Sequence, residues 1–595
     1  MTQSLPKFLY LTKGHHKSLV AIAFLFILIS GLEVFGTGMI GPFIAVATNP
    51  SLIKNNNWLN LAYERLNFTS EQNFIIALGA VVLVAFYVKS FLGFEAQKAV
   101  FRFGYRLKAE LAYKLLRAYL SAPYSFHLRS NSATLIQNTT MTTDNVCIGV
   151  VMPLLTAISN TAITVALILL LISVSPLALV LIVLLLPVVV GLIRSLRSRL
   201  ALWTKEGWAA SAEMIRILNH GLGGLKETRV IGCESYFEQQ MENQAKKFAQ
   251  NITLAQSYGN LPRFVIEAFM ITFLIAFTLL FISLSQGGES QNLTAILGIF
   301  ALASIRLLPA ISNLVSNFNT LRSNFFAVDK LFFDFKEIEK GEILLSRPKN
   351  ILSGFNDLTL SFGEQILLDN IIFQYPGSSK KSLDEISLII RKGQSIGLIG
   401  KSGAGKTTLV DVLLGLFIPQ SGDIKIDGVS IYDGGNLRAW QNLLGYVPQS
   451  IFLTDDTLER NIAFGVPDHL IDQDRLSQAI KMAQLSEVVE QLPEGVKTAV
   501  GERGVLLSGG QRQRVGIARV LYHEREILVF DEATAALDTE TEQLVTEATK
   551  ALSGTKTIII IAHRLSTIEH CDRIYQLEQG RVLKSGTYQE VVLGR

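Results

Sequence analysis

The sequence predicts two domains of different fold class: a bundle of membrane-spanning α-helices, followed by an α/β domain of the P-loop type. Charged residues make up only 17% of the 595 residues, whereas a soluble chain has about 25%. The mean hydropathy is positive, at +0.35, and the apolar excess lies in the first half. The second half contains the glycine-rich stretch GKSGAGKTT at 400–408. We therefore place the domains at 1–335 and 336–595.

Six apolar runs in the first domain are long enough to span a membrane, which takes about 20 residues for roughly 30 Å of hydrocarbon. They cover residues 18–47, 73–95, 146–173, 176–196, 264–285 and 291–315. Only SVSPL separates the third run from the fourth, and only SQGGESQN separates the fifth from the sixth. We therefore expect six transmembrane helices with tight turns between these two pairs.

The distribution of basic residues predicts the orientation of these helices. Segment 96–145 contains seven Lys or Arg residues and segment 194–263 contains ten, whereas the loop 48–72 contains two and the loop 286–291 none. Positive charge favours the cytoplasmic side. We therefore expect both basic segments and both chain termini in the cytoplasm.

The two basic segments have helical composition and continue directly from the spans, so we expect helices that extend far into the cytoplasm. Polar interruptions at 125–134 and 219–228 mark the expected tips. The functional interpretation is that these tips contact the second domain. The alternative is that the segments are simply solvated helices.

A phosphate-binding loop is predicted at 400–408, because a β-rich run, QSIGLIG, precedes it and an apolar helix, LVDVLLGL, follows. The glycines let main-chain N–H groups converge on the phosphates, and the helix adds its positive N-terminal end. Lys406 is expected to reach the β- and γ-phosphates, and the Thr407 hydroxyl to ligate Mg²⁺. The predicted nucleotide-binding residues of this loop are Gly400, Ser402, Gly403, Gly405, Lys406, Thr407 and Thr408.

The stretch ILVFDEATAALD at 527–538 supplies acidic residues for the same site. Its four apolar residues indicate a buried parallel strand. Asp531 at the end of this strand is expected to hold Mg²⁺, and Glu532 to orient or deprotonate the attacking water. Two solvated carboxylates at a strand end are the alternative, but this does not explain the apolar strand before them.

The sequence LSGGQ at 507–511, ahead of this strand, resembles the signature of ABC-transporter ATPases. GERG at 501–504 resembles the X-loop of the exporters in that family. The resemblance implies that Tyr375 in FQYPGS stacks on adenine and that Gln449 in YVPQS is a catalytic-site Mg²⁺ ligand. It also implies that Asp538 closes the D-loop and that His563 in IAHRLS faces the γ-phosphate.

The same resemblance implies how two chains share ATP. In this family two ATPase domains form a head-to-tail sandwich, with the phosphate loop of one facing the signature of the other. The implied signature contacts are Ser508, Gly509, Gly510 and Gln511. Because the signature starts a helix, its N–H dipoles favour a phosphate there. One chain holds one half of each site, so we expect a homodimer with ATP and Mg²⁺ as cofactors; pairing with a sibling chain is the alternative. At Ala535 in the D-loop the family usually has serine. This departure puts in doubt only the details of cross-talk through the D-loop, not catalysis.

Three charges in or near the spans are the candidate substrate residues: Glu33, Lys89 and Arg306. A charge near the middle of a membrane costs about 2.5–3.5 kcal/mol on insertion scales, so it tends to face the protein interior or a water-filled cavity. Arg306 is the best candidate for contacting an anionic head group, with a structural ion pair as the alternative. Lys89 can instead extend to the cytoplasmic surface, and Glu33 can pair with a neighbouring helix.

The cargo is indicated by resemblance to a subgroup of these exporters. The stretch GLEVFGTGMIGPFI at 31–44 and the motif RLLP in the last span resemble exporters that flip lipid-linked oligosaccharides or polysaccharide-related glycolipids. The loop at 51–68 has apolar residues at rough helical spacing, with Trp58 and Tyr63 suited to a membrane interface. It resembles the external helix of that subgroup, with an ordered loop cap as the alternative.

The sequence therefore predicts an ATP-driven exporter or flippase, with the fold of an ABC exporter, that works by alternating access in a bacterial inner membrane. Its amphipathic substrate is expected to be a lipid-linked oligosaccharide or glycolipid. A general lipid or multidrug exporter, an importer and an ATP-gated membrane protein remain the alternatives. Six apolar spans exclude a soluble ATPase that acts on nucleic acid.

Overall fold

The structure is a computed structural model that describes residues 5–48, 50–51, 53, 57–68, 70–174, 177–284, 290–342, 360–532, 539–562 and 564–594. The chain divides into two compact units. The first comprises Met1–Ser121 and Ser130–Glu339, and the second comprises Ala122–Arg129 and Lys340–Arg595. The second unit thus includes a short segment that lies, in the sequence, inside the predicted membrane domain.

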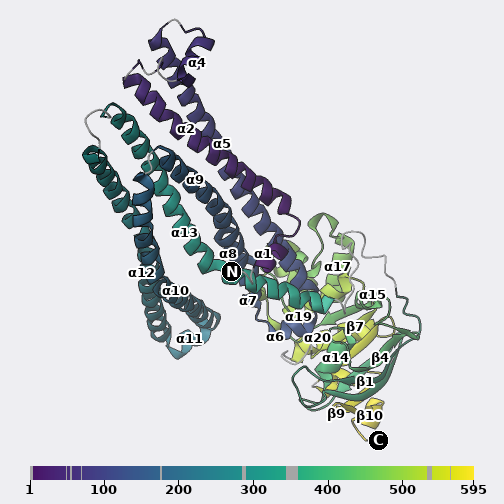
Figure 1. Ribbon diagram of the computed structural model, residues 1–595. Helices are drawn as coiled ribbons and strands as arrows, with labels where there is room; N and C mark the ends of the chain where they lie inside the picture. Colours follow the sequence, from purple (N-terminus) through teal and green to yellow (C-terminus); the bar gives the residue numbers. More distant parts are fainter. Residues whose placement is uncertain are drawn as a thin grey trace. The chain divides into compact units, whose positions relative to one another are not determined.

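The first unit is helical wherever the structure assigns it regular elements (Figure 1). Its long helices are α2 (His16–Thr48), α5 (Glu71–Ser121), α9 (Met152–Val174), α10 (Leu177–Gly223), α12 (Glu234–Leu284) and α13 (Ser290–Glu342). Its shorter elements are α1 (Leu5–Leu11), α4 (Asn57–Arg65), α7 (Ser132–Gln137), η1 (Asn138–Thr142), α8 (Thr143–Val146), η2 (Cys147–Val151) and α11 (Leu225–Ile231). Helices α10 and α12 run side by side, with α11 at their joined ends.

The described residues of each predicted span are helical; the span at 146–173 begins in α8 and η2 and continues in α9, and each of the others falls in one long helix. Among the described residues, three helical segments are long and apolar enough to cross a membrane: His16–Ile40, Glu71–Ser121 and Ser132–Ser173. The other three predicted spans fall in α10, α12 and α13, where many side chains of the apolar runs lie outside the described residues.

The long helices continue well beyond their spans, as predicted. Helix α5 has 51 residues, which at 1.5 Å per residue is about 76 Å, more than twice the thickness of the hydrocarbon. The predicted tips are also short helices in the structure: α6 (Tyr124–Arg129) follows α5, and α11 joins α10 to α12.

The second unit contains two β-sheets. An antiparallel sheet has the strand order β2 (Leu383–Arg391), β1 (Gln365–Phe373), β4 (Ser421–Ile426) and β5 (Val429–Ser430). A larger sheet has the order β10 (Arg581–Gly586), β9 (Arg573–Glu578), β3 (Ser395–Ile399), β8 (Thr557–Ile561), β7 (Ile527–Asp531) and β6 (Leu444–Val447). Its strands are parallel except for the edge strand β10.

Short helices surround these sheets. They are α6, α14 (Lys406–Leu413), α15 (Asn436–Leu443), α16 (Leu458–Ile462), η3 (Asp468–Leu470), α17 (Gln473–Met482), α18 (Ser486–Gln491), η4 (Gly495–Lys497), η5 (Glu502–Gly504), α19 (Gly509–Tyr522), α20 (Thr539–Leu552), η6 (Leu565–Ile568) and α21 (Tyr588–Val591).

The larger sheet separates two hydrophobic cores. Successive side chains of a strand point to opposite faces, so Ile527 and Val529 of β7 enter one core while Leu528 and Phe530 enter the other. Burial on both faces explains why this strand reads as a continuous apolar run rather than an alternating one.

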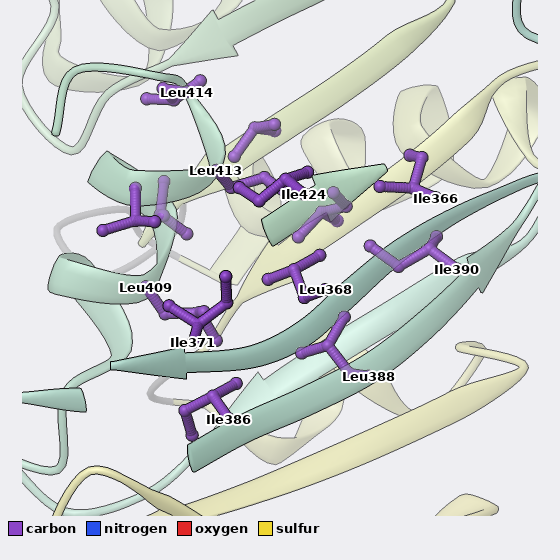
Figure 2. Close-up of a cluster of buried hydrophobic side chains, with 14 of the residues drawn as sticks. Ile366, Leu368, Ile371, Ile386, Leu388, Ile390, Leu409, Leu413, Leu414 and Ile424 are labelled. Atoms are coloured by element: carbon purple, nitrogen blue, oxygen red, sulfur yellow. The ribbon is translucent and has the colours of Figure 1, made fainter. Parts of the chain in front are cut away.

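The first core lies between the two sheets and includes α14 (Figure 2). The second lies on the other face and includes α16, α17 and α19. The phosphate-loop helix and the signature helix therefore pack on opposite faces of one sheet.

Candidate functional site

The phosphate loop forms at the end of β3, where the strand gives way to α14. Gly405 has φ +102°, a left-handed conformation that favours glycine, and an added Cβ would lie 2.8 Å from the carbonyl oxygen of Ser382. At Gly400 an added Cβ would lie 2.3 Å from the carbonyl oxygen of Leu577. These close approaches explain why the loop requires glycine at both positions.

Lys406 is the first residue of α14 and is only 5% exposed. Its Nζ donates hydrogen bonds to the carbonyl oxygens of Gly400, at 2.7 Å, and Lys401, at 3.3 Å. The ammonium group therefore lies over the loop. A buried cation whose partners are neutral carbonyls fits an anionic ligand, because an anion would supply the missing charge.

Tyr375 lies beside the same helix. Its hydroxyl is 3.2 Å from the hydroxyl of Thr408, and its ring packs edge-on against Phe373 and Phe417. The structure thus brings the predicted adenine-stacking residue to the phosphate-loop helix, although the two are separated by more than thirty residues in the sequence.

Two carboxyl groups of this unit, those of Asp531 and Asp411, interact electrostatically. Asp531, at the end of β7, is 7% exposed and accepts a hydrogen bond of 3.1 Å from the Tyr446 hydroxyl. Burial, together with the charge of Asp531, raises the pKa of Asp411 to about 6. Burial and Asp531 also raise the pKa of Tyr446. Like charges repel each other, and the buried carboxylate of Asp531 is a suitable ligand for a divalent cation such as Mg²⁺. Sequence reasoning missed Asp411, which is an acidic position in an otherwise apolar helix.

Glu532 follows directly after β7 in a constrained conformation. Its φ is +49°, which is uncommon for a residue other than glycine, and its N–H donates to the carbonyl of Ile561 at 3.1 Å. The Gln449 amide donates a 2.8 Å hydrogen bond from Nε2 to Glu532 Oε2. The structure therefore brings the predicted base and the predicted Q-loop glutamine into direct contact.

The signature forms the N-terminus of α19 through a capping box. The Ser508 hydroxyl accepts a hydrogen bond from the Gln511 N–H at 3.2 Å, and the Gln511 side chain accepts one from the Ser508 N–H at 2.8 Å. This arrangement fixes the start of the helix. Gly509 and Gly510 form its first turn, where N–H groups have no partner within the helix.

The signature and the phosphate loop do not meet in the described part of this chain. No hydrogen bond or ion pair there joins residues 508–511 to residues 400–408. The cause is the arrangement of the two cores, because α14 and α19 lie on opposite faces of the sheet.

Two predicted site residues, Asp538 and His563, lie outside the described residues, as does Ala535. Next to them, Glu542 is 9% exposed and forms an ion pair with Arg564. Glu542 also accepts a 3.0 Å hydrogen bond from the Ser566 hydroxyl. Sequence reasoning did not single out this pair.

The three predicted charges of the membrane unit form one cluster. Lys89 Nζ pairs with Glu33 Oε2, and Arg306 Nε lies 3.2 Å from Glu33 Oε1 in an ion pair. The exposed fractions of the side chains are 6% for Glu33, 12% for Lys89 and 45% for Arg306. Lys89 thus turns toward Glu33 instead of extending to a surface, and the cluster carries one excess positive charge on its most exposed member.

A helix, α4, is present within the predicted segment 51–68, and this segment packs back onto the helices beside it. Tyr63 lies 5.5 Å, centroid to centroid, from Phe74 and 6.3 Å from Phe68, and Phe68 lies 5.3 Å from Phe74. This aromatic cluster ties α4 to the start of α5, while the side chain of Trp58 lies outside the described residues.

Two cavities in the first unit were not predicted. The larger, of 430 Å³, lies between α12 and α13 and includes Arg263, Asn260 and Asn313 in its lining. The smaller, of 280 Å³, is lined by Phe26, Gln97, Thr156, Ser159, Asn160, Asn313 and Asn317. The signal in the sequence was ISNLVSNFNT after Pro309, where Asn and Ser recur at helical spacing without a charge.

Family comparisons match both halves of the chain. The model of the ABC transporter transmembrane region matches residues 19–305, and the ABC transporter model matches residues 383–535. A solved structure, that of a bacterial Atm1-family ABC exporter with ATP bound, has a TM-score of 0.74 and 23% sequence identity and covers 98% of both chains. It shows that the chain has this fold.

Several relatives carry the name ATP-dependent lipid A-core flippase. The protein of Cupriavidus metallidurans is 32% identical over 476 residues, which cover 80% of this chain and 77% of that protein. The protein of Ralstonia nicotianae is 30% identical over 486 residues, covering 81% and 79%. The protein of Shewanella sp. strain MR-4 is 29% identical over 581 residues, covering 95% and 92%.

Proposed function

This chain belongs to the ABC transporters, as an ATPase that drives transport through a membrane region in the same chain, and we propose that it flips an anionic glycolipid. The observation that carries the substrate class is the cluster of Glu33, Lys89 and Arg306. Its excess positive charge sits on Arg306, which is nearly half exposed. A cation retained among apolar helices suits an anionic head group, and the relatives named lipid A-core flippases support the glycolipid.

The roles of the ATPase residues follow from their positions. The loop residues Gly400, Ser402, Gly403 and Gly405 hold the phosphates of ATP, and Lys406 neutralises them. Tyr375 receives the adenine ring next to Thr408. Glu532 accepts a proton from the attacking water, and the Gln449 amide orients its carboxylate by the 2.8 Å hydrogen bond.

Mg²⁺ fits next to this loop. Thr407, Gln449 and Asp531 would hold it, and the bound ion would neutralise charge on the transferred phosphoryl group. The buried carboxylate of Asp531, 7% exposed at the end of β7, supports this position for the ion. The chain itself therefore keeps an acidic position ready beside the phosphate loop. Asp538 and His563 complete the site in this proposal.

A homodimer completes each ATP site. The signature residues Ser508, Gly509, Gly510 and Gln511 lie on the far side of the sheet from the phosphate loop of their own chain. A second copy can present its signature to that loop, where the N-terminus of α19 favours the γ-phosphate.

The tip around α11 supports the same assembly. It carries large apolar side chains that are mostly exposed: Leu222 is 66% exposed, Val230 81% and Ile231 74%. A cluster of this kind marks a protein interface. In the proposed homodimer the second copy covers this tip.

The proposed location of the protein is the bacterial inner membrane, with both termini and the ATPase unit in the cytoplasm. Closure of the ATPase dimer moves the helix tips, and the spans alternate between inward-facing and outward-facing states. Segment Ala122–Arg129 supports this coupling, because it groups with the ATPase unit. Within that unit, the ring centroids of Tyr124 and Phe417 are 5.5 Å apart.

The test uses the purified chain alone in proteoliposomes, with fluorescent lipid A-core and a fluorescent polyprenyl-diphosphate-linked oligosaccharide as separate probes. Flipping of either probe that requires ATP supports the proposal, and the probe that moves identifies the glycolipid. Glu532→Gln is expected to bind ATP and lose turnover and flipping together. ATPase activity without flipping of either probe would refute the glycolipid cargo, and normal turnover in the variant would refute Glu532 as the base. Absence of ATPase activity would refute the homodimer.

A further inference from the structure

The smaller cavity of the membrane unit has a polar lining without a charged residue. Four helices contribute to it: Phe26 comes from α2, Gln97 from α5, Thr156, Ser159 and Asn160 from α9, and Asn313 and Asn317 from α13. Six of the seven lining side chains are amides or hydroxyls. Inside a membrane protein such side chains either hydrogen-bond across helices or line a functional cavity.

The lining groups have hydrogen-bonding capacity beyond their internal contacts. Asn317 Nδ2 is buried and has no hydrogen-bond partner among the described residues. An unpaired buried amide costs about 1–3 kcal/mol, and native proteins rarely keep one without a reason. The Asn160 amide donates to the Thr156 carbonyl at 2.8 Å; an amide offers two donors and an acceptor with two lone pairs, so further capacity remains.

The cavity extends from the ends of two predicted spans toward the middle of a third. Gln97 is just past the end of the span at 73–95, and Asn313 is close to the end of the span at 291–315. With the predicted orientation these two positions are toward the cytoplasm, on the side from which a substrate head group enters. Asn160 lies at the middle of the span at 146–173.

Neutral amides and hydroxyls select for a ligand that both donates and accepts hydrogen bonds and carries no charge. Sugar hydroxyls have this character. A phosphate group would instead require cations, and an acyl chain would require an apolar wall. The two cavities share Asn313, so a head group with more than one sugar ring could occupy both.

We propose that this cavity binds the sugar hydroxyls of the transported glycolipid and thereby gives the transporter its preference for a glycosylated head group. The inference rests on the proposed function and adds a binding site to it. The expected hydrogen-bonding residues are Asn160, Asn313 and Asn317, with Gln97, Thr156 and Ser159 completing the wall.

The test compares Asn160→Leu, Asn317→Leu and the milder Asn160→Ala with the wild-type chain in proteoliposomes. Lipid A-core is titrated, and the concentration that half-maximally stimulates ATPase activity is measured together with basal ATPase activity and Tm. Each Leu variant is expected to raise the half-maximal concentration about tenfold, which corresponds to about 1.4 kcal/mol. Basal ATPase activity is used to normalise each titration, and the Tm of Asn317→Leu is expected to equal or exceed that of wild type, because the substitution removes an unpaired buried amide.

Asn243→Leu is the matched control, because Asn243 lies on the exposed side of α12 away from the cavity lining. This control is expected to change neither the half-maximal concentration of lipid A-core nor the Tm. An unchanged half-maximal concentration in all three variants would overturn this inference and leave the proposed function standing. A Tm well below wild type in every variant would overturn it in favour of a structural role. If lipid A-core does not stimulate the ATPase activity of the wild-type chain at any concentration, the proposed function itself is refuted.

Discussion

The ion pair between Glu33 and Lys89 predicts a stability pattern that a double-mutant cycle can test. The perturbations are Glu33→Gln, Lys89→Met and the two combined. Both side chains are nearly buried, at 6% and 12% exposure. Each single substitution leaves a charge among apolar helices, whereas the double substitution removes both.

The expected magnitudes follow from this burial. Breaking a buried ion pair by removing one partner costs about 3–5 kcal/mol, whereas replacing both partners by neutral groups is often close to neutral. For Glu33→Gln the loss is expected at the upper end, because Arg306 also loses its partner. Arg306→Met is expected to cost less, about 0.2–1 kcal/mol, because that side chain is 45% exposed.

The assay is thermal unfolding of the purified protein in detergent, with retained ATPase activity after heating as a second readout. The singles should unfold well below wild type, and the double variant should recover most of the loss. If the losses of the two singles simply add in the double variant, the ion pair does not couple these residues, and the argument from burial is wrong.

Two further predictions concern the ATPase unit. The pKa of Asp411 is raised from 3.8 to about 6, so its contribution to stability is full below about pH 4 and is lost as the pH rises through 6. Asp411→Asn should therefore raise the free energy of unfolding of the nucleotide-free protein at pH 8 by up to about 3 kcal/mol, at 1.36 kcal/mol per pKa unit, and by less at pH 5. The measurement is the Tm at both pH values, and an equal rise in Tm at pH 5 and pH 8 would contradict this. Tyr124→Ala should abolish stimulation of ATPase activity by substrate and keep basal activity, because the ring lies 5.5 Å from Phe417, outside the phosphate loop. Tyr124→Phe should retain stimulation, and loss of basal activity in Tyr124→Ala would count against a coupling role.

The sequence was most informative where local patterns determine structure. The phosphate loop could be predicted because its glycines, strand and helix are contiguous. The span-bearing helices could be predicted from apolar length, and the long extensions from composition. The division between the two units was less accessible. Segment Ala122–Arg129 belongs with the ATPase unit through contacts to residues such as Phe417, which are almost 300 residues away.

What the sequence could not supply was the pairing of distant side chains. Lys89 had two plausible positions, and only the packing of α2 against α5 directs it to Glu33. Asp411 appeared to be an ordinary helix residue until the structure showed its burial and the electrostatic influence of Asp531. The polar cavity was missed for the same reason, since its residues come from four helices and each contributes only one to three.

The two-core arrangement of the ATPase unit links these observations to function. Strands β7 and β8 send alternate side chains to opposite faces, so the α14 core and the α19 core are rigidly separated by one layer of backbone. The phosphate loop and Asp531 are fixed to that layer through β3 and β7, while the signature is fixed to it through α19. Local rearrangement cannot bring the signature around the sheet to its own phosphate loop without dismantling both cores. In the proposed homodimer, ATP therefore acts as the joint between two chains, and its hydrolysis releases that joint. Under that proposal, a chain with one complete set of motifs requires a second copy to close each ATP site.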